Sequence, residues 1–101
     1  MSKFSANRTP KTAYGLAWYK QEQWQHLLDV SADKDNLENT YAEWVKNAEK
    51  ALKQFQRQGM KVVKVNVDID DLCFWCQAQN IPVNGESRVN YVAFKLQQMS
   101  E

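Results

Sequence analysis

The sequence predicts a mostly helical α+β domain, with four helices and two short strands in the order β-α-α-β-α-α. Three observations lead to this prediction. Large and small residues alternate before residue 20, apolar residues recur at spacings of three and four over residues 35–58, and valines alternate with polar residues after Gly59. The 101 residues are 44% hydrophobic and 25% charged, which is typical of one globular domain.

The first strand is predicted over residues 12–19. Tyr14, Leu16 and Trp18 alternate with Ala or Gly, so one face of the strand is large and the other is small. The small face would let a helix approach the strand closely.

Two helices are predicted next, over residues 20–30 and 35–58. Either Ser31 or Asp33 could cap the second of them, and Gly59 supplies a left-handed end. The apolar stripe of this longer helix consists of Leu37, Tyr41, Trp44, Ala48, Leu52 and Phe55.

One strand and two helices are predicted after residue 60. A strand is predicted over residues 61–67, and Asp68 is placed to cap a helix over residues 69–80. Residues 81–85 contain a proline and a glycine and predict a turn. A last helix follows, with one face formed by Val89, Val92, Ala93 and Leu96. Because helices separate the two strands, we expect them to pair in parallel through a crossover.

Domain organisation and location follow from composition. We expect a flexible basic tail at residues 1–11, which carry three basic residues and no acid, and a single globular domain at residues 12–99. The first residues lack a secretory pattern and no apolar run is long enough for a membrane span. Two cysteines are too few for a disulfide scaffold. These observations predict a cytoplasmic protein without membrane contact.

Cys73 and Cys76 form the one obvious chemical motif, Cys-x-x-Cys. It is compatible with a redox pair, with half of a metal site, or with two buried residues. Asp68, Asp70 and Asp71 disfavour a thiolate, and a zinc site needs four ligands. Both cysteines lie on the apolar stripe of their helix, so the buried interpretation is favoured and no cofactor is expected.

A basic stripe lies on the long helix, opposite its apolar face. Its members are spaced four, three and four residues apart and fall within about 60° of one another. They are Lys46, Lys50, Lys53 and Arg57. The net charge of +1 excludes the general basicity of many nucleic-acid-binding proteins but not a local basic surface.

These observations favour a non-enzymatic protein–protein interaction module over an enzyme. A two-stranded sheet has open edges that invite a strand from a second copy, so we expect a homodimer, and a further protein partner that is unknown. The basic stripe would supply electrostatic contact, and Phe74, off the main stripe of its helix, would supply apolar contact. Nucleic-acid binding through the basic stripe is the alternative, and an activity at Cys73 and Cys76 is a third hypothesis.

Two resemblances accompany these patterns. Residues 13–97 resemble a family of small uncharacterised bacterial proteins through the segments AWYKQEQW (17–24), VSAD (30–33), YAEW (41–44), WC (75–76) and PVNG (82–85). That resemblance implies a single domain and no particular activity. Residues 72–96 are also similar to a SAP-type helix-turn-helix, a small DNA-binding motif, through Ile81–Gly85 between two helices. The second helix departs from that motif because its only basic residues are Arg88 and Lys95.

Overall fold

The computed structural model describes residues 13–99. The predicted basic tail at residues 1–11 lies outside the described residues. The elements follow one another as β1 (Ala13–Trp18), η2 (Gln21–Gln23), α1 (Trp24–Val30), η3 (Lys34–Asn36), α2 (Tyr41–Arg57), β2 (Lys61–Asn66), α3 (Ile69–Ala78) and α4 (Gly85–Met99), where η marks a short 3₁₀ helix.

The predicted α+β class is confirmed, with mostly helical structure around a two-stranded parallel sheet. The predicted order of elements is incomplete, because it lacks η2 and η3. The helix expected over residues 20–30 is a 3₁₀ turn followed by α1, which is only 7 residues long. No helix within residues 13–99 is long and apolar enough to cross a membrane.

The long helix begins six residues later than predicted, at Tyr41 rather than at residue 35. Thr40 caps it: the Thr40 hydroxyl accepts a hydrogen bond from the backbone N–H of Glu43 (3.1 Å). The Glu43 carboxylate in turn accepts from the N–H of Thr40 (3.3 Å). This reciprocal capping box fixes the start of α2. The predicted end is confirmed, since Gly59 follows α2 with a φ of 82°.

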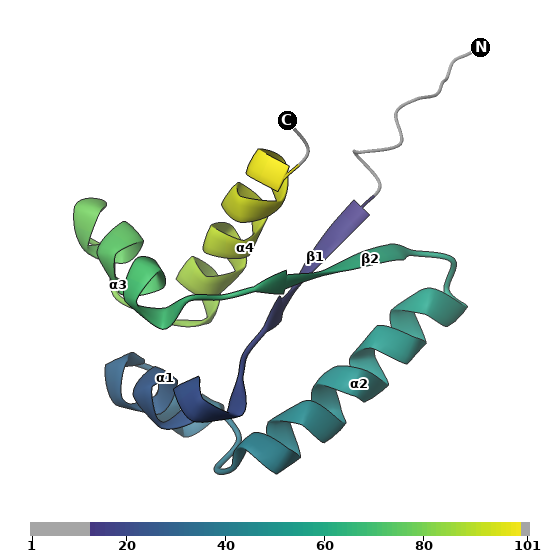
Figure 1. The fold of residues 1–101 in the computed structure, drawn as a ribbon, viewed down its shortest axis with the longest axis horizontal. Coiled ribbons are helices and arrows are strands. Elements are labelled where there is room, and N and C mark those ends of the chain that lie inside the picture. Colours follow the sequence, from purple (N-terminus) through teal and green to yellow (C-terminus); the bar gives the residue numbers. More distant parts are fainter. Residues whose placement is uncertain (1–12, 100–101) are drawn as a thin grey trace.

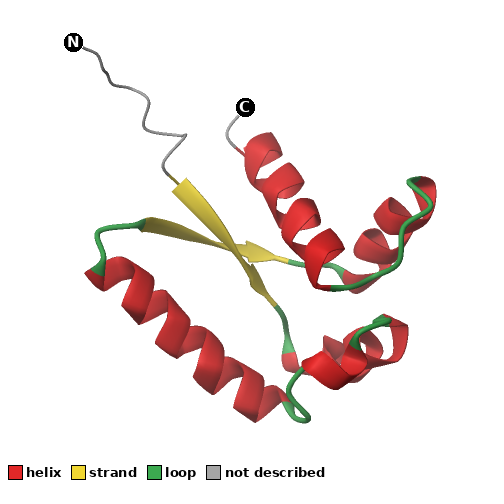
Figure 2. Ribbon diagram, turned by 180° about the vertical axis from the view of Figure 1, so that it is seen from behind, coloured by secondary structure: helices red, strands yellow, loops and turns green. Residues whose placement is uncertain are grey.

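The two strands pair in parallel, as expected, with Ala13 opposite Lys61 and Trp18 opposite Asn66. Figures 1 and 2 show α2 along one side of the strand pair and α4 along the other. The small face of β1 receives α4, because a Cβ added to Gly15 would lie 2.6 Å from Cγ1 of Val92. The prediction that this face admits a close helix is therefore confirmed.

An aromatic cluster closes the carboxyl end of β1 against α1 and α2. Neighbouring ring centroids in this cluster lie 5.1 to 6.2 Å apart. The rings belong to Trp18, Tyr19, Trp24, Tyr41 and Trp44. Such pairs add to the free energy gained from apolar burial alone, so the cluster fixes β1 relative to both helices.

The apolar face predicted for the last helix is partly wrong. Val92 is buried and Leu96 is half-buried, but Val89 and Ala93 are exposed. Tyr91 is buried in their place and packs edge-on against Trp75 of α3, with ring centroids 5.6 Å apart. Because α4 packs against both β1 and α3, its buried face is centred one residue away from the stripe that the sequence suggests.

Candidate protein-interaction surface

The outer edge of β1 carries backbone groups that point away from β2. The carbonyl oxygen of Trp18 accepts a hydrogen bond from the N–H of Val67 (3.0 Å), so Trp18 faces the second strand. Successive residues of a strand direct these groups to opposite sides, and Gly15 and Ala17 therefore direct theirs outward. Within residues 13–99, no backbone hydrogen bond from outside the strand pair reaches either residue. This edge can accept another strand.

The carboxyl end of the same edge is closed. The hydroxyl of Tyr41, in the first turn of α2, donates a hydrogen bond to the carbonyl oxygen of Tyr19 (2.9 Å). Burial raises the pKa of the Tyr19 phenol to about 12, so its own hydroxyl stays protonated. Because the Tyr41 hydroxyl occupies the Tyr19 carbonyl oxygen, the open part of the edge is limited to the segment around Gly15 and Ala17.

An apolar groove of about 420 Å³ lies along this open segment. Its floor is β1 at residues 15–17, one wall is α2 at Trp44 and Ala48, and the other wall is α4 at Val89 and Val92. Val89 is 68% exposed, although it is a large hydrophobic residue. A polar rim of Glu38, Asn47 and Arg88 borders the groove. Apolar walls around an unpaired strand edge are suited to an extended polypeptide segment.

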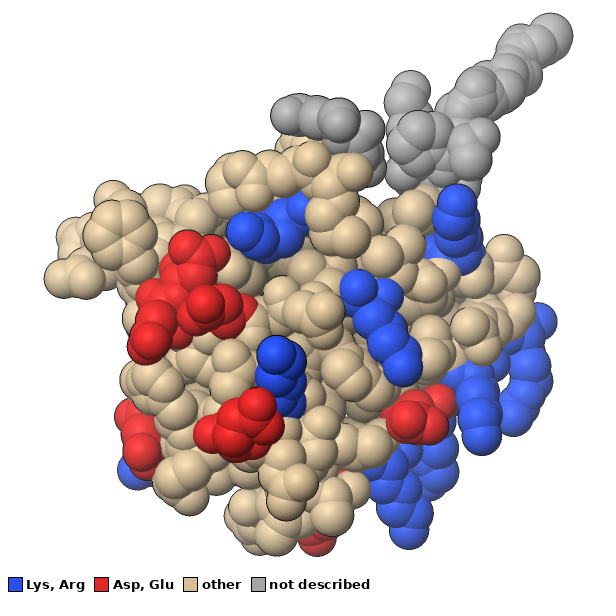
Figure 3. All heavy atoms as spheres, in the orientation of Figure 1, with Lys and Arg blue, Asp and Glu red and all other residues tan. Residues whose placement is uncertain are grey.

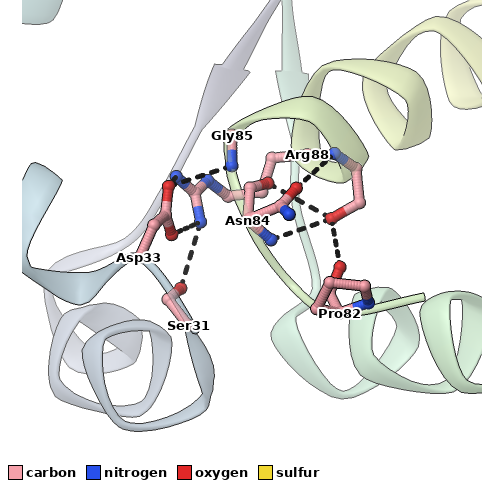
Figure 4. Close-up of polar contacts among 7 residues, drawn as sticks. Ser31, Asp33, Pro82, Asn84, Gly85 and Arg88 are labelled. Atoms are coloured by element: carbon pink, nitrogen blue, oxygen red, sulfur yellow. Dashed lines mark hydrogen bonds and ion pairs between the residues drawn. The ribbon is translucent and has the colours of Figure 1, made fainter.

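An ion pair holds the α4 wall in position (Figure 4). The guanidinium of Arg88 donates hydrogen bonds to both carboxylate oxygens of Asp33, at 2.9 and 2.8 Å, and one to the hydroxyl of Ser31 at 3.1 Å. The Asp33 carboxylate also accepts from the N–H of Gly85 (3.0 Å). The hydrogen bonds from Arg88 lower the pKa of Asp33. Neither Ser31 nor Asp33 caps α2, contrary to the prediction, because α2 begins only after Thr40; both residues bind Arg88.

The start of α4 is fixed by a second set of contacts. The side chain of Asn84 accepts from the N–H of Ser87 (3.0 Å), and the Ser87 hydroxyl accepts from the N–H of Asn84 (2.9 Å). The hydroxyl also donates to the carbonyl oxygen of Pro82 (2.8 Å). Figure 4 shows these bonds beside the Arg88 ion pair. Together they fix the end of α4 that carries Arg88 and Val89.

The predicted basic stripe lies on the exposed side of α2. Lys46, Lys50, Lys53 and Arg57 are all exposed. Among residues 13–99, Arg88 and Lys95 form ion pairs within 4 Å and His26 lies 3.7 Å from Asp70, but no member of the stripe takes part in such a contact. Figure 3 shows one group of basic side chains over α2 and one group of acidic side chains near the start of α3, with single charged side chains elsewhere on the same face. The stripe and the groove lie on different sides of α2, and a hollow lined by Glu38, Asn47, Lys46 and Lys50 lies between them.

Phe74 belongs to a third surface, formed by α3 and α4. It is 71% exposed, and Phe94, which is 40% exposed, stacks on Trp75 with ring centroids 5.9 Å apart. Phe74 is therefore available for apolar contact. Its role in binding a partner protein stays a prediction.

The Cys73 thiol has little thiolate character, and Cys76 is buried. Cys76 is 1% exposed, and Cys73 is partly buried. Burial, followed by the neighbouring Cys76 and Asp70, raises the pKa of the Cys73 thiol. No cluster of three or more potential metal ligands occurs within residues 13–99. These contacts fit two packing residues of the α3 core.

A tyrosine–carboxylate contact joins α3 to α4. The Tyr91 hydroxyl donates to the Asp71 carboxylate (2.6 Å), and the ammonium group of Lys95 lies 3.7 Å from the same oxygen. Burial and this hydrogen bond raise the pKa of the Tyr91 phenol. The contact couples the groove wall on α4 to the rest of the domain.

Comparisons with known proteins identify no relative from which a function could be inferred. No protein-family model, no curated protein and no solved structure matches the chain. The resemblances to a small bacterial family and to a SAP-type motif stay predictions. The sequence analysis did not identify the pair of Arg88 and Asp33, because these residues are 55 positions apart in the chain. It also did not identify Val89 as a groove residue, because Val89 was assigned to the buried face of the last helix.

Proposed function

We propose that the protein is a non-enzymatic protein–protein interaction module that forms a homodimer through the outer edge of β1. The observation that supports this most directly is the unpaired edge at Gly15 and Ala17, which forms the floor of an apolar groove. Exposed strand edges readily pair with another strand. In this proposal the second strand is β1 of another copy.

The edge is self-complementary in an antiparallel arrangement. A two-fold axis at Leu16 would place Gly15 of one copy opposite Ala17 of the other, with their backbone N–H and carbonyl groups exchanging hydrogen bonds. Both residues are small, and both side chains would face the α4 side of the sheet. A strand that enters the groove must have small side chains opposite Val89 and Val92. The β1 strand of a second copy has them, at Gly15 and Ala17.

The second strand of the sheet is a weaker candidate. It carries Lys61 and Lys64, and lysines on an edge strand oppose pairing with another chain. The Lys64 ammonium lies 4.0 Å above the Trp18 ring, which is a cation–π contact within the domain. The dimer is therefore proposed at β1.

Native mass spectrometry and sedimentation velocity on the untagged protein test this proposal. The expected species has twice the chain mass of 11.8 kDa. Val89→Glu should raise the dimer dissociation constant at least about tenfold, because it places a charge in the apolar interface. Phe74→Glu is the matched control: it makes the same kind of change at a similarly exposed residue outside the groove and should leave the dimer intact.

A second variant addresses the strand edge itself. Ala17→Pro removes an N–H that faces outward, which an edge strand tolerates, and should give a folded monomer with an unchanged circular dichroism spectrum. A wild-type monomer at micromolar concentration would contradict the proposal. A dimer that dissociates with Phe74→Glu but not with Val89→Glu would place the interface on α3 and α4 instead.

A further inference from the structure

The basic stripe of α2 has a geometry that the dimer alone does not explain. We infer that it binds the phosphate backbone of a nucleic-acid double helix, with both copies of the proposed dimer contributing. Lys46 and Arg57, its first and last members, are 11 residues apart, so the stripe extends over about 16 Å of helix. This inference rests on the proposed function, because one copy supplies only half of the surface.

The cations of the stripe are available to a ligand. Three other cations of residues 13–99 have partners: Arg88 binds Asp33, Lys95 lies near Asp71, and Lys64 covers an aromatic ring. The four side chains of the stripe are exposed, and none of them takes part in the ion pairs or cation–π contacts of residues 13–99. Their charge is not neutralised by a neighbouring carboxylate within 4 Å.

The surroundings of the stripe distinguish between classes of polyanion. The surface between the cations is formed by Ala42, the half-buried Val45, Glu49 and Gln54, and Glu38 and Glu43 line a hollow beside Lys46 and Lys50. A protein interface usually has an apolar or aromatic anchor at its centre, and this surface has no exposed one within α2. A single strand would need aromatic side chains for base stacking, but Tyr41, Trp44 and Phe55 lie on the opposite face. A double helix, contacted through its phosphates, requires only cations.

The proposed dimer places the two stripes on one face. A two-fold axis perpendicular to the sheet keeps both copies of α2 on the same side of the four-stranded sheet that results. Each stripe points away from that sheet, so the dimer presents four cations from each copy to one ligand. A double helix carries one phosphate charge per about 1.7 Å of its axis, which matches an extended row of cations better than a compact anion does.

Fluorescence anisotropy with a labelled DNA duplex of about two helical turns, over a range of salt concentrations, tests the inference. If all eight cations contact phosphates, log K should fall with log salt with a slope of about −7, and affinity should drop about 10⁴-fold between about 50 and 200 mM salt. The double variant Lys50→Ser/Lys53→Ser should reduce the slope to about −4. Its matched control, Lys20→Ser/Lys34→Ser, removes the same charge from exposed positions outside α2 and should keep the wild-type slope.

The remaining outcomes separate this inference from the dimer. A wild-type dimer that does not bind the duplex would overturn the inference and leave the proposed function intact. A monomeric protein that binds with a slope of about −4, as the four cations of one copy predict, would overturn the dimer and support the α2 surface. Equal binding of polyglutamate would indicate an acidic protein partner, and tighter binding of the single strand would indicate a different nucleic-acid surface. Either result would contradict the double-helix assignment.

Discussion

The guanidinium of Arg88 binds both carboxylate oxygens of Asp33, at 2.9 and 2.8 Å, and this pair joins α4 to the loop that follows α1. The side chains are only 11% and 18% exposed. A pair this well shielded from solvent holds a groove wall in position, because removing either partner leaves the other with an uncompensated charge.

The first prediction concerns this pair. Asp33→Asn should lower the free energy of unfolding by about 2 to 4 kcal/mol at neutral pH, measured by urea denaturation. Because Arg88 lowers the folded-state pKa of Asp33, its contribution is fully present above the unfolded pKa of about 3.8 and is lost as pH falls through the folded pKa. Wild-type stability should therefore drop more steeply below about pH 4 than that of Asp33→Asn. Parallel pH profiles for the two proteins would contradict this assignment.

The second prediction concerns the contact of β1 with α4. Gly15→Ala should destabilise the fold by about 1 to 3 kcal/mol, because the new methyl group would lie 2.6 Å from Cγ1 of the stiff Val92 side chain. The double variant with Val92→Ala should recover part of that loss, so the two changes should not be additive in a double-mutant cycle. If the losses of unfolding free energy in the two single variants were additive, the added methyl group would not be in contact with Val92.

The third prediction tests the observed cap of α2. Thr40→Ala should lower the unfolding free energy by about 1 kcal/mol and reduce helicity near the start of α2, as seen by amide hydrogen exchange. Asp35→Ala, at an exposed position within η3, serves as the control and should change stability by less than about 0.5 kcal/mol. Equal effects would argue against the capping box.

The fourth prediction concerns Cys73. Its raised pKa and partial burial should make the folded protein react with a thiol reagent at least about tenfold more slowly than the urea-unfolded chain at pH 8. The variant Cys76→Ser isolates Cys73 in this measurement, and Cys73→Ser isolates Cys76, which is nearly inaccessible. Rapid labelling of Cys73 in the folded protein would contradict this prediction and would support the hypothesis of a reactive thiol.

Local patterns predicted the fold well where one interaction decides the structure. The alternation before residue 20 indicated β1 and its small face, and Gly59 indicated the end of α2. The start of α2 was misplaced because the apolar stripe continues upstream through Leu37, while the reciprocal bonds of Thr40 and Glu43 begin the helix later. The pattern was visible as Thr-x-x-Glu in the sequence, but it competed with the stripe.

The candidate site was predicted less completely. The exposure of the basic stripe follows from helical periodicity, so its four members could be placed correctly. The groove could not, because its walls come from α2 and α4, which only the tertiary structure brings to the same edge of β1. The pairing of Arg88 with Asp33 has no local signal in the sequence either, and Asp33 was interpreted as a possible helix cap.

The crossover between the two strands also constrains how the chain acquires its structure. The partner of β1 begins at Lys61, and the helix that packs against its small face begins at Gly85. During synthesis, β1 emerges before β2 and has no strand to pair with until residues 19–60 have followed it. Non-local pairing of this kind slows folding, and an unpaired strand is vulnerable to association with other chains. The edge of β1 that is proposed to join two folded copies is thus also the edge that can associate with other chains before the domain has folded.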